Sequence, residues 1–200
     1  MKKESRKQHI LECLAHMLED NPGGKITTAK LAAEVGVSEA ALYRHFPSKT
    51  KMFEGLIEFM EGVIFSRINL IIQEEEECIE RCYQITYLLL KFTEQNPGIT
   101  RLLTGDILAG ETPRLRERIA QFYDRVEMQL KNILREAEIK EHIRPIMPMT
   151  AAANLLLMTT DGHIHQYVRS NFKRKPTEYW EEQWPILIEG FFKRTMGGVV

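Results

Sequence analysis

The chain has 200 residues, of which 44% are hydrophobic and 28% charged, and its formal net charge at pH 7 is -1. These values are ordinary for a globular protein and exclude disorder over most of the chain. No apolar run approaches the ~18 residues of a membrane-spanning helix, and residues 1–7 are not followed by the apolar segment of a secretion signal. The sequence therefore predicts a cytoplasmic protein without a membrane partner.

Basic residues are concentrated at the N-terminal end. Residues 1–51 contain nine Lys and Arg against six Asp and Glu, whereas the remaining residues contain 18 against 22. This positive excess favours a nucleic-acid partner for the N-terminal end. The basic arm of this end consists of Lys2, Lys3, Arg6 and Lys7. It is either a solvated tail or a further contact to DNA, and the glutamates at 74–77 are either a solvated helix end or an acidic patch.

Apolar residues recur at helical spacing between Gly and Pro residues, which predicts an all-α chain with no sheet. Helices are expected over residues 5–19, which Asn21-Pro-Gly-Gly24 ends, then as a helix-turn-helix within 26–46, and over 48–73, 78–94, 97–103, 113–138, 150–172 and 177–192. The expected domains are a helix-turn-helix domain at 1–52, a helical dimerisation and effector domain at 53–195, and a tail at 196–200.

The later helices carry further expectations. Ser48, after Pro47, is expected to cap the long helix at its N-terminus. The inner side of that helix is expected to consist of Met52, Phe53, Leu56, Ile57, Met60, Val63, Ile64 and Ile68. Two prolines predict a loop at 143–148, and Pro185 is expected to kink the last helix. The aromatic residues expected in the core or an interface, rather than in a cofactor cage, are Trp180, Trp184, Phe191 and Phe192.

Residues 26–46 have the parts of a helix-turn-helix. Thr28 is expected to cap the first helix and Ser38 the second. Gly36 is expected to form the turn, because a left-handed helix end is free of steric strain only for Gly. The residues expected to face the core are Leu31, Ala32, Val35, Leu42 and Phe46.

Polar side chains are placed where a helix-turn-helix meets DNA. The residues expected to face outward from the second helix are Glu39, Ala40, Tyr43 and Arg44. The donors spaced to reach phosphates are Thr27, Tyr43, His45 and Lys49. Backbone N–H groups at the start of the long helix add the positive end of a helix dipole. The alternative is a helical hairpin in the core of an unrelated protein, where outward Tyr43 and Arg44 would be unusual.

Residues 26–53, including ALYRHFPSK at 41–49, resemble the DNA-binding domain of TetR-type regulators. That family consists of all-helical homodimers with a three-helix reading head and a variable body. The resemblance implies base-facing side chains at Ser38, Glu39, Ala40 and Arg44. It implies phosphate contacts to palindromic double-stranded DNA from Thr27, Thr28, Tyr43, His45 and Lys49. Because the base-facing set is poor in bidentate donors, phosphate contacts and DNA shape are expected to provide much of the affinity.

The body resembles one TetR-type subgroup, the nucleoid occlusion factors, which bind chromosomal sites and restrain the division protein FtsZ. The segments that carry the resemblance are LIEFME at 56–61, SRINL at 66–70, NPGITRLLTG at 96–105, RVEMQL at 125–130 and YVRSNFKRKPT at 167–177. Residues 106–111 and the tail after Phe192 depart from the pattern of the subgroup. The resemblance implies a nucleoid-associated dimer that inhibits FtsZ ring assembly. The alternative is a ligand-responsive TetR-type repressor.

In that subgroup the FtsZ tail lies in a groove between the long helix and the next one. The positions that the resemblance implies for this groove are Phe59, Arg67, Leu88, Lys91 and Asn96. Phe59 and Arg67 are eight residues apart, about two turns, and therefore share a helix face. The alternative is that Phe59 belongs to the core and Arg67 is an ordinary surface charge.

Other classes of chemistry find little support in the sequence. No Gly-rich phosphate loop, nucleophile elbow or paired carboxylates indicate an enzyme, and no cofactor is expected. Cys78 and Cys82, like Asp161 and His165, have the spacing of two ligands on one helix face, but no further ligand pair accompanies them, so no metal is expected. The last two helices are expected to pair with their copies in a homodimeric four-helix bundle.

Overall fold

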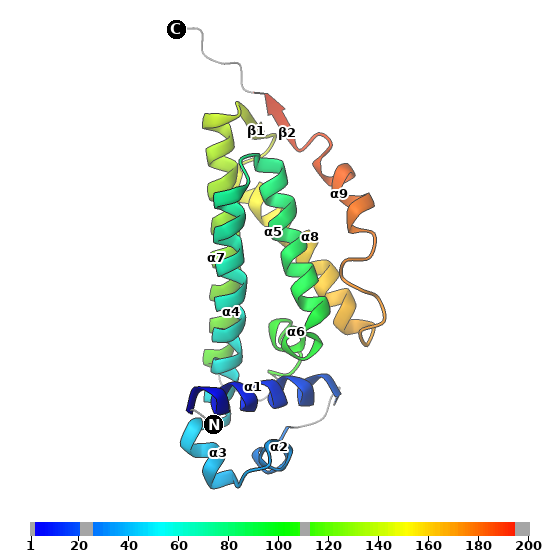
Figure 1. Ribbon diagram of the computed structural model, residues 1–200. Coiled ribbons are helices and arrows are strands. Elements are labelled where there is room, and N and C mark those ends of the chain that lie inside the picture. Colours follow the sequence, from blue (N-terminus) through cyan, green and yellow to red (C-terminus); the bar gives the residue numbers. More distant parts are fainter. Residues whose placement is uncertain (1–2, 21–25, 109–112, 195–200) are drawn as a thin grey trace. The chain divides into compact units, whose positions relative to one another are not determined.

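A computed structural model describes residues 3–20, 26–108 and 113–194, without the side chains of residues 3–5 and 194. The helices are α1 (Lys3–Asp20), α2 (Thr28–Val35), α3 (Glu39–His45), α4 (Lys49–Glu74), α5 (Cys78–Gln95), α6 (Pro97–Leu103), α7 (Pro113–Lys140), α8 (Met149–Arg169) and α9 (Trp180–Ile188) (Figure 1). The all-α fold class is confirmed. The expected stop at 21–24 and the tail at 196–200 lie outside the described residues.

One small sheet corrects the expectation of a chain without strands. Strand β1 (Ile143–Pro145) pairs antiparallel with β2 (Phe192–Arg194). The last helix ends at Ile188 rather than near Phe192, because Gly190 takes a left-handed φ of 73° and redirects the chain. Three-residue strands are too short to leave an alternating pattern in the sequence. Residues 143–145, expected as a loop, therefore have a partner far along the chain.

The described residues form two compact units that share α4 and α7. The first unit comprises Met1–Val63 and Gln95–Ala120, and the second comprises Ile64–Glu94 and Gln121–Val200. The first unit thus joins α6 to the reading head formed by α1, α2 and α3. This division follows packing, and the functional boundary between residues 52 and 53 stays a prediction.

In the first unit, α1 packs closely against α6. A Cβ atom added to Gly98 would meet the carbonyl oxygen of Ala15 at 2.0 Å, so only glycine permits this approach. The buried guanidinium of Arg101 donates a 2.8 Å hydrogen bond to the carbonyl of Leu18 and a 2.7 Å bond to Asp106. These contacts fix the C-terminal half of α1 on α6.

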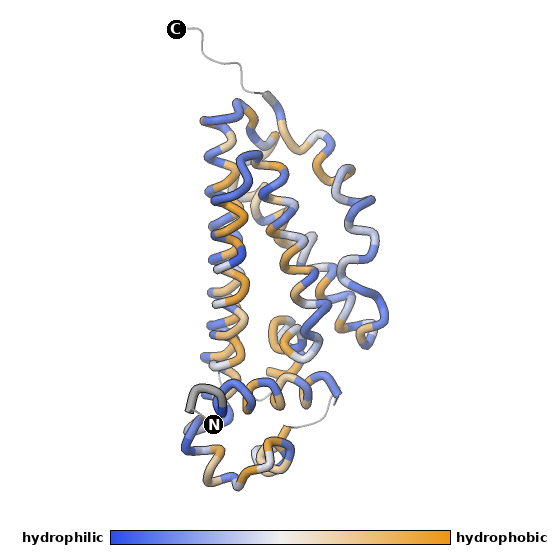
Figure 2. The backbone as a smooth tube through the Cα atoms, viewed as in Figure 1, coloured by the Kyte–Doolittle hydropathy of each residue, from blue (hydrophilic) through white to orange (hydrophobic). Residues whose placement is uncertain are grey.

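The second unit is held by amphipathic helices and aromatic side chains. Hydrophobic and hydrophilic residues alternate at helical spacing along α5 (Figure 2). Trp180 and Trp184 are buried with ring centroids 5.7 Å apart, and Phe191 is buried too, which confirms the expected aromatic core. Phe192 is only half-buried because it lies in β2.

Two further findings concern possible metal ligands and membrane-spanning helices. Among the described residues, no three His, Cys, Asp or Glu side chains come together as a metal site. Cys78 and Cys82 are buried within α5. His165 lies 3.2 Å from Asp161, whose carboxylate also accepts a 2.9 Å hydrogen bond from the hydroxyl of Tyr123. None of the helices in the described ranges has the length and apolarity needed to cross a membrane.

Candidate nucleic-acid interface and adjoining pocket

The first helix of the motif begins one residue earlier than expected. Thr27, with an extended backbone, caps α2 through its hydroxyl, which accepts a 3.3 Å hydrogen bond from the Lys30 amide. The expectation that Thr28 is the cap is therefore wrong, because Thr28 already has helical geometry. Gly36 takes the predicted left-handed conformation, with φ 73°, and ends α2.

The recognition helix α3 is built as the sequence predicts. The hydroxyl of Ser38 accepts a 3.2 Å hydrogen bond from the amide of Ala41 and caps the helix. The residues buried by α2, α3 and the turn after α3 are Leu31, Ala32, Val35, Leu42 and Phe46. The residues exposed on the other side of α3 are Glu39, Ala40, Tyr43 and Arg44. This arrangement leaves one polar face of α3 free for a ligand.

Three of the predicted DNA-facing side chains are joined on that face. The Thr28 hydroxyl donates a 2.8 Å hydrogen bond to the carboxylate of Glu39 and accepts a 3.2 Å bond from the hydroxyl of Tyr43. The bonds cross from α2 to α3, so they orient both helices as well as the side chains. No pattern in the sequence indicates this link between α2 and α3.

The start of α4 adjoins the same motif. The Ser48 hydroxyl accepts a 3.1 Å hydrogen bond from the amide of Lys51, which confirms Ser48 as the cap. The ammonium group of Lys49 lies 5.3 Å from the centroid of the Phe53 ring, and His45 and Lys49 are both half-buried. On α1, the ammonium group of Lys7 lies 5.7 Å from the Phe46 ring, so part of the basic arm packs on the motif.

Ion pairs to α7 fix the first part of α4. Arg114 Nε lies 3.0 Å from Glu54, and Arg118 Nη2 lies 2.5 Å from Glu61. A hydrogen bond from Lys51 lowers the pKa of Glu54 below its usual value, with Arg114 and Arg118 adding to the effect against partial burial. The carboxylate of Glu54 is therefore held ionised beside the arginines of α7.

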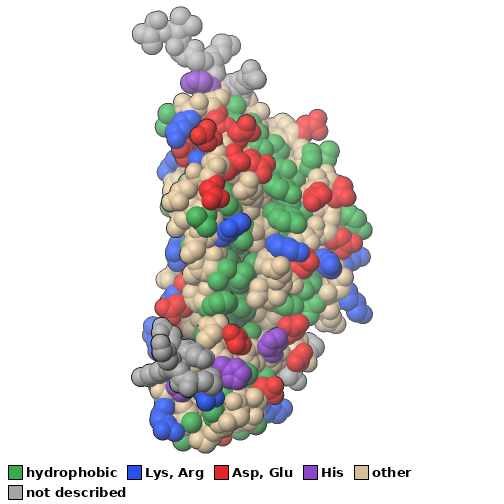
Figure 3. Space-filling model, viewed as in Figure 1, with side chains coloured by type: hydrophobic (Ala, Val, Ile, Leu, Met, Phe, Trp, Pro, Cys, Tyr) green, Lys and Arg blue, Asp and Glu red, His purple; other side chains and the backbone are tan. Residues whose placement is uncertain are grey.

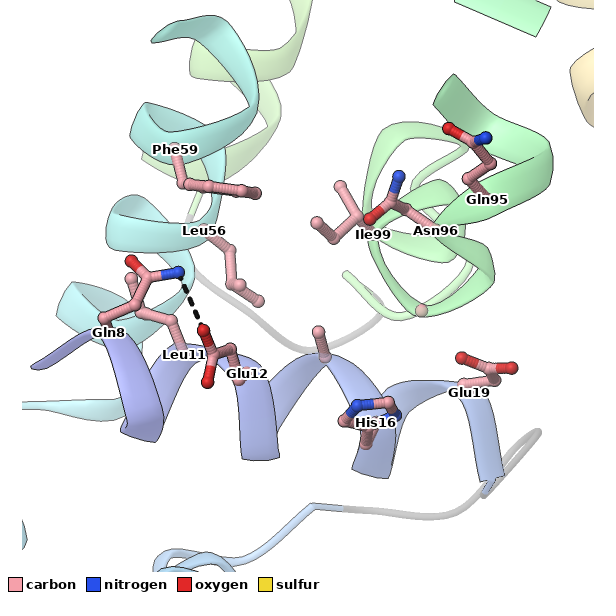
Figure 4. Close-up of a pocket in the computed structure, with 12 residues that line it drawn as sticks. Gln8, Leu11, Glu12, His16, Glu19, Leu56, Phe59, Gln95, Asn96 and Ile99 are labelled. Carbon is pink, nitrogen blue, oxygen red and sulfur yellow. Dashed lines mark hydrogen bonds between the residues drawn. The ribbon is translucent and has the colours of Figure 1, made fainter. Parts of the chain in front are cut away.

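Two of the five predicted groove residues line a pocket in the first unit. This α1–α6 pocket has a volume of about 200 Å³. It is lined by Gln8, Leu11, Glu12, Ala15, His16, Glu19, Leu56, Phe59, Gln95, Asn96, Gly98 and Ile99 (Figure 4). The Phe59 side chain is 38% exposed, so Phe59 is not a core residue. The lining residues on α1 were missed by sequence reasoning, because they come from a different part of the chain.

The other three groove residues lie in the second unit. Arg67 is exposed on α4, and Leu88 and Lys91 are half-buried on α5. The ammonium group of Lys91 lies 3.2 Å from Glu94. Val63, expected on the inner side of the long helix, is 41% exposed in the first unit, which corrects that expectation. Whether the five residues make one groove stays a prediction.

The chain matches two protein families in sequence. Residues 10–56 match the bacterial regulatory proteins of the tetR family, and residues 76–191 match the tetracyclin repressor-like C-terminal domain. The chain is 58% identical over 188 residues to the nucleoid occlusion factor SlmA of Marinomonas sp. (strain MWYL1). The matched residues make up 94% of this chain and 95% of the relative. It is also 59% identical over 185 residues to SlmA of Shewanella woodyi, and this match makes up 92% of this chain and 94% of that relative.

Solved structures share the fold at low sequence identity. The regulator FadR of Bacillus subtilis, solved in complex with stearoyl-CoA, has a TM-score of 0.78 at 17% identity, over 92% of this chain and 98% of that one. A TetR transcription regulator from Haloarcula marismortui has a TM-score of 0.79 at 16% identity, and the superposition covers 95% of this chain and 100% of that one. At this identity the likeness shows the TetR-type fold alone.

Proposed function

This chain belongs to the SlmA family of nucleoid occlusion factors, and on that basis we propose that it binds chromosomal DNA as a homodimer and inhibits FtsZ ring assembly over the nucleoid. The observation that carries the DNA-binding part is the exposed polar face of α3, opposite the buried Leu42 and next to the capped start of α4. The family membership carries the nucleoid occlusion part. The proposed activity is regulatory and requires no cofactor.

Contacts to DNA are assigned along this face. Exposed Arg44 and Ser38 are suited to base edges, and Glu39 is suited to accept from a cytosine amino group. The groups proposed to hold phosphates are Thr27, Thr28, Tyr43, His45 and Lys49. Since one short helix buries little surface, a second copy is needed to read a palindromic site with useful affinity.

Exposed apolar residues in the second unit support a dimer. On α8 the side chains of Leu155 and Met158 are 38% and 45% exposed, and on α9 Ile186 is 70% exposed. Hydrophobic side chains also reach the surface over α5 and α9 (Figure 3). Apolar surface of this kind on a helical protein is commonly buried against a partner. We therefore place the homodimer interface on α8 and α9.

The FtsZ contact is assigned to Phe59, Asn96, Arg67, Leu88 and Lys91. Its support in the structure is the exposed aromatic ring of Phe59 at the α1–α6 pocket, which Asn96 also lines. An exposed aromatic ring at a pocket is a common anchor point for a protein partner.

Retention of FtsZ with and without DNA tests this proposal. The immobilised protein is incubated with purified FtsZ in the presence of a palindromic DNA site that it has been shown to bind, and in its absence. We expect FtsZ to be retained in both conditions and more strongly with DNA. If FtsZ is retained in neither, the function is instead that of a ligand-responsive repressor, which releases DNA when a small molecule binds.

A further inference from the structure

The α1–α6 pocket has an apolar floor. Leu56 and Ile99 are almost fully buried beneath it, with exposed fractions of 1% and 2%, and Leu11 is half-buried beside them. The side chains of Phe59 and Ile99 point toward each other from α4 and α6 (Figure 4). The volume of about 200 Å³ is below the ~300 Å³ of small-molecule sites. The pocket therefore suits one inserted apolar side chain better than a whole cofactor.

The rim of the pocket on α1 is acidic. Glu12 and Glu19 are exposed there, on either side of His16. Glu12 accepts a 3.1 Å hydrogen bond from the amide of Gln8 (Figure 4). Among the described residues that line the pocket, none is Lys or Arg. No Lys or Arg of the lining therefore pairs with the two carboxylates, and a basic group that does lie beside Glu12 is the imidazole of His9, whose Nδ1 is 4.0 Å away.

We infer that the pocket docks a segment of the division-protein partner that presents an apolar side chain next to a Lys or Arg. The apolar side chain enters between Phe59 and Ile99. The cation is attracted by the carboxylates of Glu12 and Glu19, which lie about 10 Å apart along α1, and pairs with one of them. This inference rests on the proposed function and adds α1 to the groove residues, all of which come from α4, α5 and the start of α6. It names the chemistry that the partner must carry.

The inference links partner binding to the reading head. Helix α1 packs on α2 as well as on α6, and Gly98 and Arg101 fix its position. A partner held by Glu12 and Glu19 therefore binds to a helix that also braces the DNA-binding motif.

Charge-neutral variants of the two glutamates test this assignment. Full-length Glu12→Gln and Glu19→Gln are titrated with FtsZ on a DNA site, and each is expected to weaken FtsZ binding about two- to fivefold at low salt, as for an exposed ion pair. The loss should shrink at 1 M salt, where the Debye length is about 3 Å. Glu117→Gln, an exposed glutamate of α7 in the same unit, is the matched control and should bind as the wild type does.

A charge swap identifies the cation. Glu12→Lys is expected to bind wild-type FtsZ poorly and to regain binding to an FtsZ variant in which one Lys or Arg of its tail is changed to Glu. If Glu12→Gln and Glu19→Gln bind FtsZ like the wild type whereas Phe59→Ala does not, the acidic subsite is wrong and the proposed function stands. If the wild-type protein itself retains no FtsZ with or without DNA, the proposed function fails.

Discussion

The hydroxyl of Thr28 donates a 2.8 Å hydrogen bond to the carboxylate of Glu39, which joins the first turn of α2 to the first turn of α3. Tyr43 donates to the same hydroxyl at 3.2 Å. Three side chains assigned to DNA are therefore ordered before DNA arrives, which lowers the entropic cost of binding. The same link keeps a negative charge on a face that must approach phosphates.

Neutralising Glu39 should make DNA binding stronger and less selective. In Glu39→Gln the side chain keeps its shape but loses its charge, so we expect about two- to fivefold tighter binding to DNA without a palindromic site. The gain for the specific site should be smaller, because a carboxylate that accepts from a base is lost. Fluorescence anisotropy titrations with the specific site and with DNA that lacks it, at one salt concentration, measure the ratio of the two affinities. An equal gain in Glu34→Gln, an exposed glutamate of α2, would instead indicate a general effect of net charge.

Lys49 is expected to contribute a phosphate contact that is independent of sequence. Lys49→Ala should weaken binding to all DNAs alike and reduce the slope of log K against log salt by about 0.9. Lys51→Ala is the control, because the ammonium group of Lys51 lies 2.5 Å from Glu54 and is already paired. Affinities measured at four or more salt concentrations give both slopes. Equal slopes in Lys49→Ala and the wild type would remove Lys49 from the contact set.

The close approach of α1 and α6 should not tolerate a methyl group. In Gly98→Ala the new Cβ meets the backbone of Ala15, so α1 must shift, and we expect a loss of about 1–3 kcal/mol in the free energy of unfolding. DNA affinity should fall too, since α1 braces α2. Gly62→Ala on α4 is the control, because nothing lies within 4 Å of its added Cβ, and it should stabilise by about 0.4–1 kcal/mol. Urea unfolding of both variants distinguishes a packing clash from a general effect of the substitution.

Features that depend on a few neighbouring residues could be predicted from the sequence. Gly36 and the caps at Ser38 and Ser48 follow from local backbone and hydrogen-bonding preferences, and all three are confirmed. Thr27 and Thr28 are both good caps, so local preference does not distinguish them. The extended backbone at Thr27, with φ -103° and ψ 150°, decides between them.

Features that join distant segments could not be predicted in this way. Leu18 and Asp106 supply acceptors for the buried Arg101, and a charged residue carries no sign of such partners in its own neighbourhood. The pairing of Pro145 with Phe192 and the contact of Gly98 with Ala15 are tertiary in the same sense. The acidic rim of the pocket escaped the sequence reasoning for this reason as well.

The carboxylate of Glu94 is expected to make the stability of the second unit depend on pH. Its side chain is 14% exposed, and burial alone would raise its pKa. Hydrogen bonds from Thr177 and Lys91, with Lys175 3.7 Å away, lower the pKa below the usual 4.5 instead. A carboxyl group with a lowered pKa in the folded state stabilises above its unfolded pKa, and this stabilisation is lost as pH falls through the folded value.

Glu94→Gln should therefore cost about 1.5–3 kcal/mol in the free energy of unfolding at pH 7, the usual range for hydrogen bonds to a charged group. The difference from the wild type should narrow as pH falls below 4.5, because protonation removes the same charge from the wild-type protein. Urea unfolding between pH 3 and pH 7 measures this difference in the free energy of unfolding. Glu76→Gln is the control, because Glu76 is an exposed glutamate before α5. A difference that stays constant down to pH 3 would mean that Glu94 acts through its packing and not through its charge.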